Sequence, residues 1–131
     1  AVAMYGATIG RVGILGIPAA VNQACCVFSN PRRIEPWFWF YWLQMRRPHL
    51  VSLAYGGGQP NLSQDLLRSI RVPTPPLTEQ QGIADFLDHE TAKLDGLVAK
   101  VRDAIDRLKE LRTALISAAV TGKIDVRAEV A

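Results

Sequence analysis

The most regular hydrophobic pattern lies in the second half of the chain, after residue 77. Apolar residues recur there every seven positions, and a second set follows three to four residues after the first. This spacing, sustained over about four heptads, is typical of a coiled-coil helix. One helix offers its own stripe no partner, so we expect it to pack on a second long helix, from the same subunit or from another copy or protein. The expected contact residues are Leu87, Leu94, Val98, Val101, Ile105, Leu108, Leu111 and Leu115.

Both ends of this helix carry sequence signals. Thr78-Glu79-Gln80-Gln81 has the form of a capping box, in which Thr78 and Gln81 satisfy each other's backbone N–H groups. Gly122 stands where a left-handed C-cap residue belongs. The sequence therefore predicts a helix over 78–122, with a C-terminal tail at 123–131.

The first 77 residues have a different pattern, with short apolar stretches separated by glycines. The stretches 1–4, 9–15, 21–28 and 70–72 favour strands, and a helix is expected to begin at Pro36 and to end before Pro48. A short helix is expected near 62–67, and three prolines at 73–76 form a stiff connector. We predict an α+β fold: a partial mixed α/β domain at 1–77, followed by the long helix. Because the chain begins in mid-strand without an initiator methionine, we expect it to be a fragment.

Composition argues against several classes of protein. Of the few possible metal ligands, Cys25 and Cys26 are adjacent, and His49 and His89 are forty residues apart, so no metal site is expected. The chain has no apolar run of the roughly 18 to 20 residues that span a bilayer, and it opens without a signal-type segment. We expect a cytoplasmic protein with no membrane partner and no cofactor of its own.

Charge is unevenly distributed along the chain. Residues 1–77 contain seven arginines, no lysine and two acids, a net charge of +5, whereas the remainder has a net charge of −2. Arginine suits bidentate contacts with phosphates or guanine edges, so this distribution favours a nucleic-acid partner for the first part. The alternative is a basic surface without a partner.

Five motifs in order carry a family resemblance. They are YGATIG at 5–10, NQA at 22–24, GGQPNLS at 57–63, PPLTEQ at 75–80 and LISAAVTGKI at 115–124. Together with the long helix after the connector, they resemble the DNA specificity subunit of type I restriction–modification enzymes. The chain looks like the C-terminal part of one target recognition domain plus its helix.

The resemblance implies a function and partners. Such subunits have two recognition domains, each reading one half of a split double-stranded DNA target, and their two long helices pair antiparallel. They are not catalytic. They hold methyltransferase (modification) subunits, which use S-adenosylmethionine, and the assembly recruits an ATP-driven restriction and translocation subunit. S-adenosylmethionine, ATP and Mg²⁺ are therefore expected on the partner subunits.

Residues suited to DNA contact are found in the first part of the chain. Glycine loops allow the backbone to approach a duplex, Gln59 or Asn61 suits adenine, and arginine suits guanine or phosphate. Purely structural roles are the alternative: Asn61 as a helix cap, Tyr5 as a packed turn residue, and the arginine pairs as solvated or helix-end residues. The candidates are Tyr5, Arg11, Arg32, Arg33, Arg46, Arg47, Gly57, Gly58, Gln59 and Asn61.

Catalytic motifs are not apparent. Asn30-Pro31-Arg32-Arg33 is not the Asn-Pro-Pro-aromatic motif of a DNA methyltransferase, and no spacing indicates a nucleophilic triad. We therefore expect a non-catalytic specificity subunit. Two alternatives remain: a coiled-coil interaction adaptor that does not bind DNA, and the recognition segment of a fused restriction–methylation enzyme.

Overall fold

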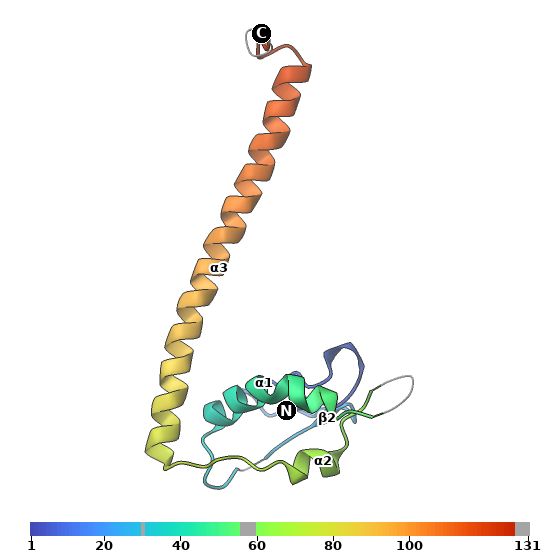
Figure 1. Ribbon diagram of the computed structural model, residues 1–131, viewed down its shortest axis with the longest axis vertical. Coiled ribbons are helices and arrows are strands. Elements are labelled where there is room, and N and C mark those ends of the chain that lie inside the picture. The colour runs from blue at the N-terminus through green and yellow to red at the C-terminus, as the bar shows by residue number, and fades with distance from the viewer. Residues whose placement is uncertain (30, 56–59, 128–131) are drawn as a thin grey trace. The chain divides into compact units, whose positions relative to one another are not determined.

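The computed structural model describes residues 1–29, 31–55 and 60–127. Its elements, in chain order, are β1 (Val2–Ala3), the 3-10 helix η1 (Gly6–Thr8), β2 (Cys25–Cys26), α1 (Pro36–Ser52), α2 (Gln64–Ser69) and α3 (Leu77–Val120) (Figure 1). The chain divides into a first compact unit, Ala1–Asp88, and a second unit that begins at His89. The predicted α+β fold with one long helix is confirmed. The first unit includes the start of α3 in addition to the residues assigned to it from sequence.

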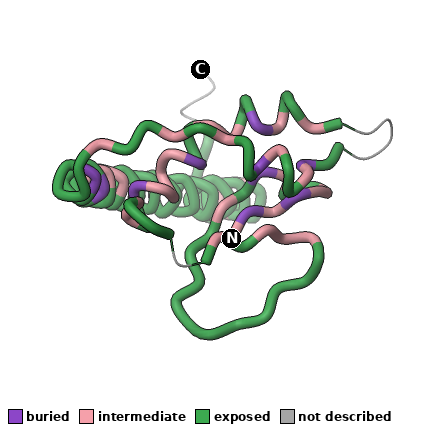
Figure 2. Tube along the Cα trace, turned by 90° about the horizontal axis from the view of Figure 1, so that it is seen from below, coloured by how far each residue is buried: buried purple, intermediate pink, exposed green. Residues whose placement is uncertain are grey.

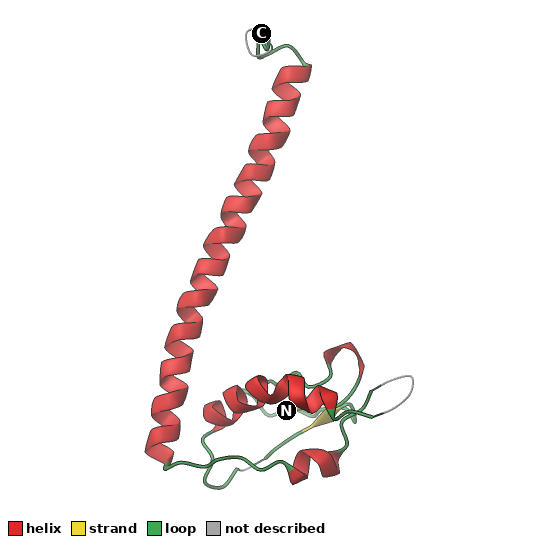
Figure 3. Ribbon diagram, in the orientation of Figure 1, coloured by secondary structure: helices red, strands yellow, loops and turns green. Residues whose placement is uncertain are grey.

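The sheet is much smaller than the sequence predicts. β1 and β2 pair antiparallel, with Val2 opposite Cys26, and Val12 forms only an isolated bridge to Val2. The strands predicted at 9–15 and 21–28 are therefore wrong over most of their length, and 70–72 is not a strand (Figure 3). The apolar residues between Gly13 and Val21 are exposed, and no strand among the described residues pairs with them. Apolar, β-branched sequence becomes strand only where a neighbouring strand completes the ladder.

Helix α1 begins as predicted but continues beyond the predicted end. Pro36 occupies its first turn, and the carboxylate of Glu35 caps it by accepting a hydrogen bond from the Phe38 N–H at 2.6 Å. The helix passes through Pro48 and ends at Ser52. A proline removes one backbone bond and costs about 3 kcal/mol inside a helix. Leu50, 2% exposed in the core, anchors the turn beyond the proline and offsets this cost.

The core of the first unit lies where β1, α1 and the segment around α2 meet. Met4 and Leu62 link two of these parts, because the Leu62 N–H donates to the Met4 carbonyl at 2.8 Å. Buried positions are gathered in this unit, whereas most of α3 is exposed (Figure 2). The main core cluster consists of Val2, Met4, Leu43, Leu50, Leu62 and Leu67.

Gln80 joins the start of α3 to the rest of the first unit. Its side chain is fully buried. The amide oxygen accepts from the Glu35 N–H at 2.9 Å, and the amide nitrogen donates to the carbonyls of Arg33, at 3.1 Å, and Pro75, at 2.7 Å. These bonds satisfy backbone groups in the turn before α1 and in the proline connector. Nearby, the Tyr41 hydroxyl of α1 donates to the carboxylate of Asp88.

The sequence predicted the C-terminal end of α3 correctly but not its N-terminal cap. The predicted capping box is wrong, because α3 already begins at Leu77. The Pro76 carbonyl accepts hydrogen bonds from the N–H groups of Glu79 and Gln80. The Gln81 amide donates forward to Asp85 instead of reaching back to Thr78. At the other end the C-cap is confirmed. Gly122 has φ +71°, and the Lys123 N–H donates to the Ala118 carbonyl at 2.8 Å, as in a Schellman motif.

We predict that Gln80→Leu destabilises the first unit by about 3 kcal/mol or more. The leucine would remove the hydrogen bonds of three part-buried backbone groups, and each such loss costs about 1 kcal/mol or more. Chemical denaturation of the two variants Gln80→Leu and Gln81→Leu measures this effect. Gln81 is exposed, so its replacement should change the free energy of unfolding by less than about 0.5 kcal/mol. Equal stability of the two variants would contradict the role of the buried amide.

Candidate nucleic-acid interface and assembly helix

The apolar stripe of α3 is exposed. From Leu94 to Leu115, the seven predicted contact residues are between 45% and 65% exposed, and Leu87 is half-buried. Spacings of three and four residues place these side chains on one face of a helix. At 1.5 Å per residue the 44 residues of α3 extend over about 66 Å. Such a face can bind a second helix along most of its length.

The α3 surface outside the stripe also has charged side chains that pair with one another. Lys93 pairs with Glu90 at 2.6 Å, and Lys109 pairs with Asp106 at 2.8 Å. These pairs join residues three positions apart on the exposed helix surface, where each contributes only a few tenths of a kcal/mol. Glu90 and Asp106 thus belong to the solvent-exposed surface of the helix, where each has a lysine partner.

Tyr5 and Asn61 lie side by side. Asn61 forms backbone bridges to both Tyr5 and Tyr55, and the Asn61 N–H donates to the Tyr55 carbonyl at 3.0 Å. Tyr5 is half-buried against the core, whereas Asn61 is exposed. The predicted contacts Gly57, Gly58 and Gln59 lie outside the described residues. The structure thus joins two candidates that are 56 positions apart in the sequence.

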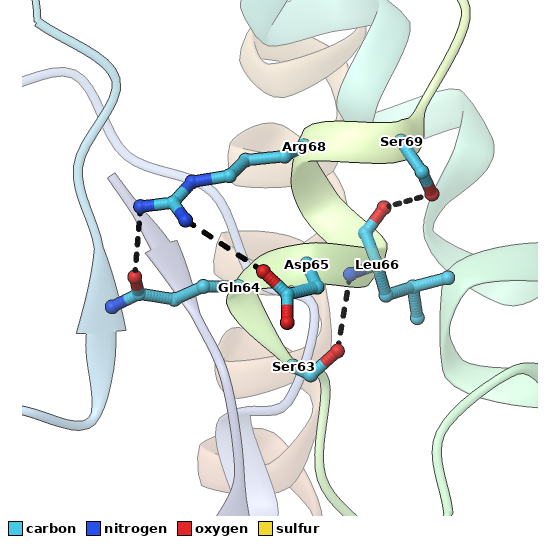
Figure 4. A network of polar contacts seen from close by, with 6 residues as sticks. All are labelled: Ser63, Gln64, Asp65, Leu66, Arg68 and Ser69. Carbon is cyan, nitrogen blue, oxygen red and sulfur yellow. Dashed lines mark hydrogen bonds and ion pairs between the residues drawn. The ribbon is translucent and has the colours of Figure 1, made fainter.

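Asn61 does not cap the short helix that follows it. Ser63 is the N-cap of α2, and its hydroxyl accepts from the Leu66 N–H at 3.0 Å (Figure 4). The side chain of Arg68, on the same helix, donates to Gln64 at 3.3 Å and lies 3.6 Å from the Asp65 carboxylate (Figure 4). Capping therefore does not account for Asn61, and Arg68 has local partners.

Arg11 and Arg47 line a single pocket. The pocket has a volume of about 300 Å³ and lies between the 10–12 segment and α1. Arg11 is exposed, whereas Arg47 is half-buried and donates from Nε to the Ile9 carbonyl at 3.2 Å. The lining residues are Gly10, Arg11, Val12, Gln44 and Arg47.

The other candidate arginines have different environments. The guanidinium of Arg46 lies over Trp42, 5.7 Å from the ring centroid, and its buried Nε has no hydrogen-bond partner among the described residues. Arg32 and Arg33 lie in the turn before α1, where Arg33 has a φ of 61° and its carbonyl is held by Gln80. In the described part of the chain, none of these three arginines forms an ion pair.

Burial and hydrogen bonding shift the pKa of groups near the two ends of the described chain. The pKa of the Asp125 carboxyl is lowered because the side chain and the backbone N–H of Arg127 donate to it. Burial lowers the pKa of the Ala1 amino group. In the described ranges, no group of three or more His, Cys, Asp or Glu side chains could hold a metal ion, and no helix is long and apolar enough to cross a membrane.

Comparison with known proteins identifies the family. Residues 2–107 match the type I restriction modification DNA specificity domain, so the match covers the first unit and much of α3. The chain belongs to this family. The resemblance drawn from the five sequence motifs is thereby confirmed.

Several specificity subunits are similar to this member of the family. The chain is 39% identical to the type I restriction enzyme EcoBI specificity subunit of Escherichia coli over 108 residues, which are 82% of the chain and 23% of that protein. It is 27% identical to a putative MjaX specificity subunit of Methanocaldococcus jannaschii over 122 residues, 92% of the chain and 28% of that protein. The chain thus spans about a quarter of the length of these curated relatives. No solved structure matches it significantly.

Sequence reasoning missed two residues that organise this specificity domain. Gln80 lies within the PPLTEQ motif, and only its burial shows that it connects three segments. Gly10 closes the YGATIG motif, adopts a φ of +70° and leaves little room for a Cβ, which would lie 3.1 Å from Arg47 Cγ. A glycine at the end of a turn motif is a usable signal for positive φ. The contact between Gly10 and Arg47 could not be predicted in this way, because the two residues are 37 positions apart in the sequence.

We predict that Gly10→Ala destabilises the specificity domain by about 1 to 2 kcal/mol, because alanine is strained at positive φ. The new methyl group would also contact the side chains of Arg47 and Val51. Gly13→Ala is the matched control, since a Cβ there meets no atom within 4 Å. Urea denaturation of both variants checks this. Equal unfolding midpoints would show that the turn tolerates a side chain at Gly10.

Proposed function

We propose that this chain is the DNA-reading part of a type I restriction–modification specificity subunit. In this proposal, the first unit reads one half of a split double-stranded DNA target, and α3 holds methyltransferase subunits in place. The family match over residues 2–107 is the observation that carries the proposal. The relatives with this domain are specificity subunits of type I restriction enzymes.

Charge supports DNA contact by the first unit. Its first 77 residues have a net charge of +5, and all their basic residues are arginines. Among the described residues, the five candidate arginines form no ion pair. Arginines without an acidic partner favour phosphate or guanine contacts, because no internal ion pair is lost on binding. Arg11, Arg32, Arg33, Arg46 and Arg47 are these candidates.

The exposed stripe supports a scaffold role for α3. The stripe residues from Leu94 to Leu115 are apolar, and each is at least 45% exposed. Such a surface favours burial against another helix or subunit. The partner would be a second long helix, from the same subunit or another copy, or a helix of a methyltransferase subunit. This surface is separate in sequence from the arginines, so DNA binding and assembly can be disrupted independently.

Catalysis is assigned to the partner subunits. In this proposal, methylation with S-adenosylmethionine belongs to the methyltransferase subunits, and ATP- and Mg²⁺-dependent cleavage belongs to the restriction and translocation subunit. The chain itself would bind no cofactor. Its contribution is to select the DNA sequence on which the others act.

We predict that the full chain, joined to its methyltransferase subunit, binds duplex DNA with an affinity that falls steeply with salt. If three arginines contact phosphates, the slope of log K against log salt is about −3. Fluorescence anisotropy with a short random-sequence duplex measures the slope. A complex that assembles but shows no DNA binding at low salt would contradict DNA reading and favour the coiled-coil adaptor.

We predict that Val101→Asp and Leu108→Asp each abolish assembly with the methyltransferase subunit. Burying a carboxylate in an apolar seam costs several kcal/mol, which corresponds to about 100-fold or more in affinity. Light scattering on a sizing column measures the complex. Thr113→Asp introduces the same charge on the opposite face and should assemble normally. Full assembly of the seam variants would remove the scaffold role from α3.

A further inference from the structure

The pocket shared by Arg11 and Arg47 differs from the surroundings of the other arginines. Two guanidinium groups and the Gln44 amide line it, together with Gly10 and Val12. Among the residues that the structure describes, the charged ones lining the pocket are both cationic, and no carboxylate lines it. Its volume of about 300 Å³ is ample for a phosphate group. The pocket therefore has the charge and the donors for an anion.

Gly10 places Arg47 in the pocket. The positive φ of Gly10 brings the backbone against α1 so closely that a Cβ would lie 3.1 Å from Arg47 Cγ and 3.2 Å from Val51 Cγ2. The aliphatic part of Arg47 consequently packs on the turn, and its Nε donates to the Ile9 carbonyl at 3.2 Å. This hydrogen bond fixes the plane of the guanidinium. No bond to the terminal nitrogens of Arg47 is found within the described ranges.

A half-buried, packed arginine is suited to phosphate more than to a base. To read guanine in the major groove, an arginine has to extend beyond the protein surface and present its terminal nitrogens to the base edge. Arg47 is held back by its packed stem and by its Nε bond. Phosphates lie on the outside of a duplex and can approach a pocket at the protein surface. A fixed guanidinium fork loses little rotamer entropy when it binds such an oxyanion.

We propose that the pocket formed by Gly10, Arg11, Gln44 and Arg47 binds one backbone phosphate of the DNA. This inference rests on the proposed DNA-reading function. Arg47 supplies the preorganised fork, Arg11 the second positive charge from the rim, and Gln44 an amide donor from the preceding turn of α1. Arg46 does not line the pocket and lies over Trp42. Arg46 and Arg47, neighbours on α1, thus have different roles. The phosphate contact fixes the register of the domain on the duplex without reading a base.

Arg11 and Gln44 are exposed, so we expect their substitution to leave the fold intact. Arg11→Gln removes a charge, and Gln44→Glu introduces a repulsive carboxylate of nearly the same shape. Arg68→Gln and Gln64→Glu make the same two changes on α2, where both side chains are exposed. Arg47→Lys adds a test of geometry, because lysine keeps the charge but loses the fork and the Nε bond.

Duplex binding by the full chain with its methyltransferase subunit, measured over a salt series, is the experiment. We expect Arg11→Gln and Gln44→Glu to weaken binding about tenfold and Arg11→Gln to reduce the salt slope by about 1. The loss should be equal for different duplex sequences, because a phosphate contact is independent of sequence. The α2 controls should bind like the unmodified chain, and Arg47→Lys should weaken binding at an unchanged net charge.

The outcomes separate this inference from the proposed function. If the unmodified complex binds DNA and the pocket variants bind equally well, the phosphate pocket is overturned and DNA reading stands. A loss confined to particular duplex sequences would also overturn it, by making the contact a base contact. If the unmodified complex binds no DNA, both proposals fail. Titration with inorganic phosphate, followed by the NMR signal of Arg47 Nε, then reports whether the pocket binds any anion.

Discussion

The buried amide of Gln80 is the interaction on which the arrangement of the first unit depends. An amide can be fully buried at acceptable cost only if its oxygen and nitrogen are both satisfied. At Gln80 they are satisfied by backbone groups alone, from Glu35, Arg33 and Pro75. Because a backbone partner cannot adopt another rotamer, this arrangement fixes the path of the chain on both sides. It sets the entry into α1, the end of the proline connector and the first turn of α3 together.

The same amide determines the conformation of a candidate DNA-binding residue. Arg33 has a φ of 61°, a region that costs a residue with a side chain about 1 to 2 kcal/mol. The Gln80 side chain donates a hydrogen bond to the carbonyl of this same residue at 3.1 Å. Glu35 then caps α1 two residues later. A hydrogen bond from α3 thus helps to stabilise the strained backbone of this exposed turn, through a residue far along the chain.

Local signals predicted the helices well and the strands poorly. Pro36, the seven-residue repeat and Gly122 are each read from neighbouring residues, and the start of α1, the long helix α3 and its C-cap are confirmed, whereas the capping box at Thr78 is not. A strand depends on a partner that local sequence does not contain, and so 13–21 stays outside the sheet despite its apolar residues. Pro48 fails as a helix end for a related reason. The burial of Leu50 in a tertiary core decides where α1 ends, and periodicity does not report burial.

In the candidate site, too, the sequence predicts which residue types are involved but not which of them lie together. Sequence selected the arginines by type, and Arg11 and Arg47 were among them. It could not pair these two in preference to Arg46 and Arg47, which are adjacent in the chain. The pairing arises because Gly10 lets the turn approach α1 at Arg47, while Arg46 is drawn to the face of Trp42. A difference of one position, about 100° around a helix, thus separates a side chain over an aromatic ring from one in a basic pocket.

The two contact surfaces proposed for this chain would rely on forces that respond differently to salt. Contacts between arginine and phosphate weaken as salt rises, because the release of counterions into a more concentrated solution gains less free energy. Burial of the leucine and valine stripe on α3 is insensitive to moderate salt and is strengthened by strongly hydrated anions such as sulfate. The five candidate DNA-contact arginines all precede residue 77 and the apolar repeat follows it, although α3 has arginines of its own at 102, 107 and 112. Under the proposed function, an assembled complex would release DNA as salt rises while its protein contacts persist, which a single mixed surface would not allow.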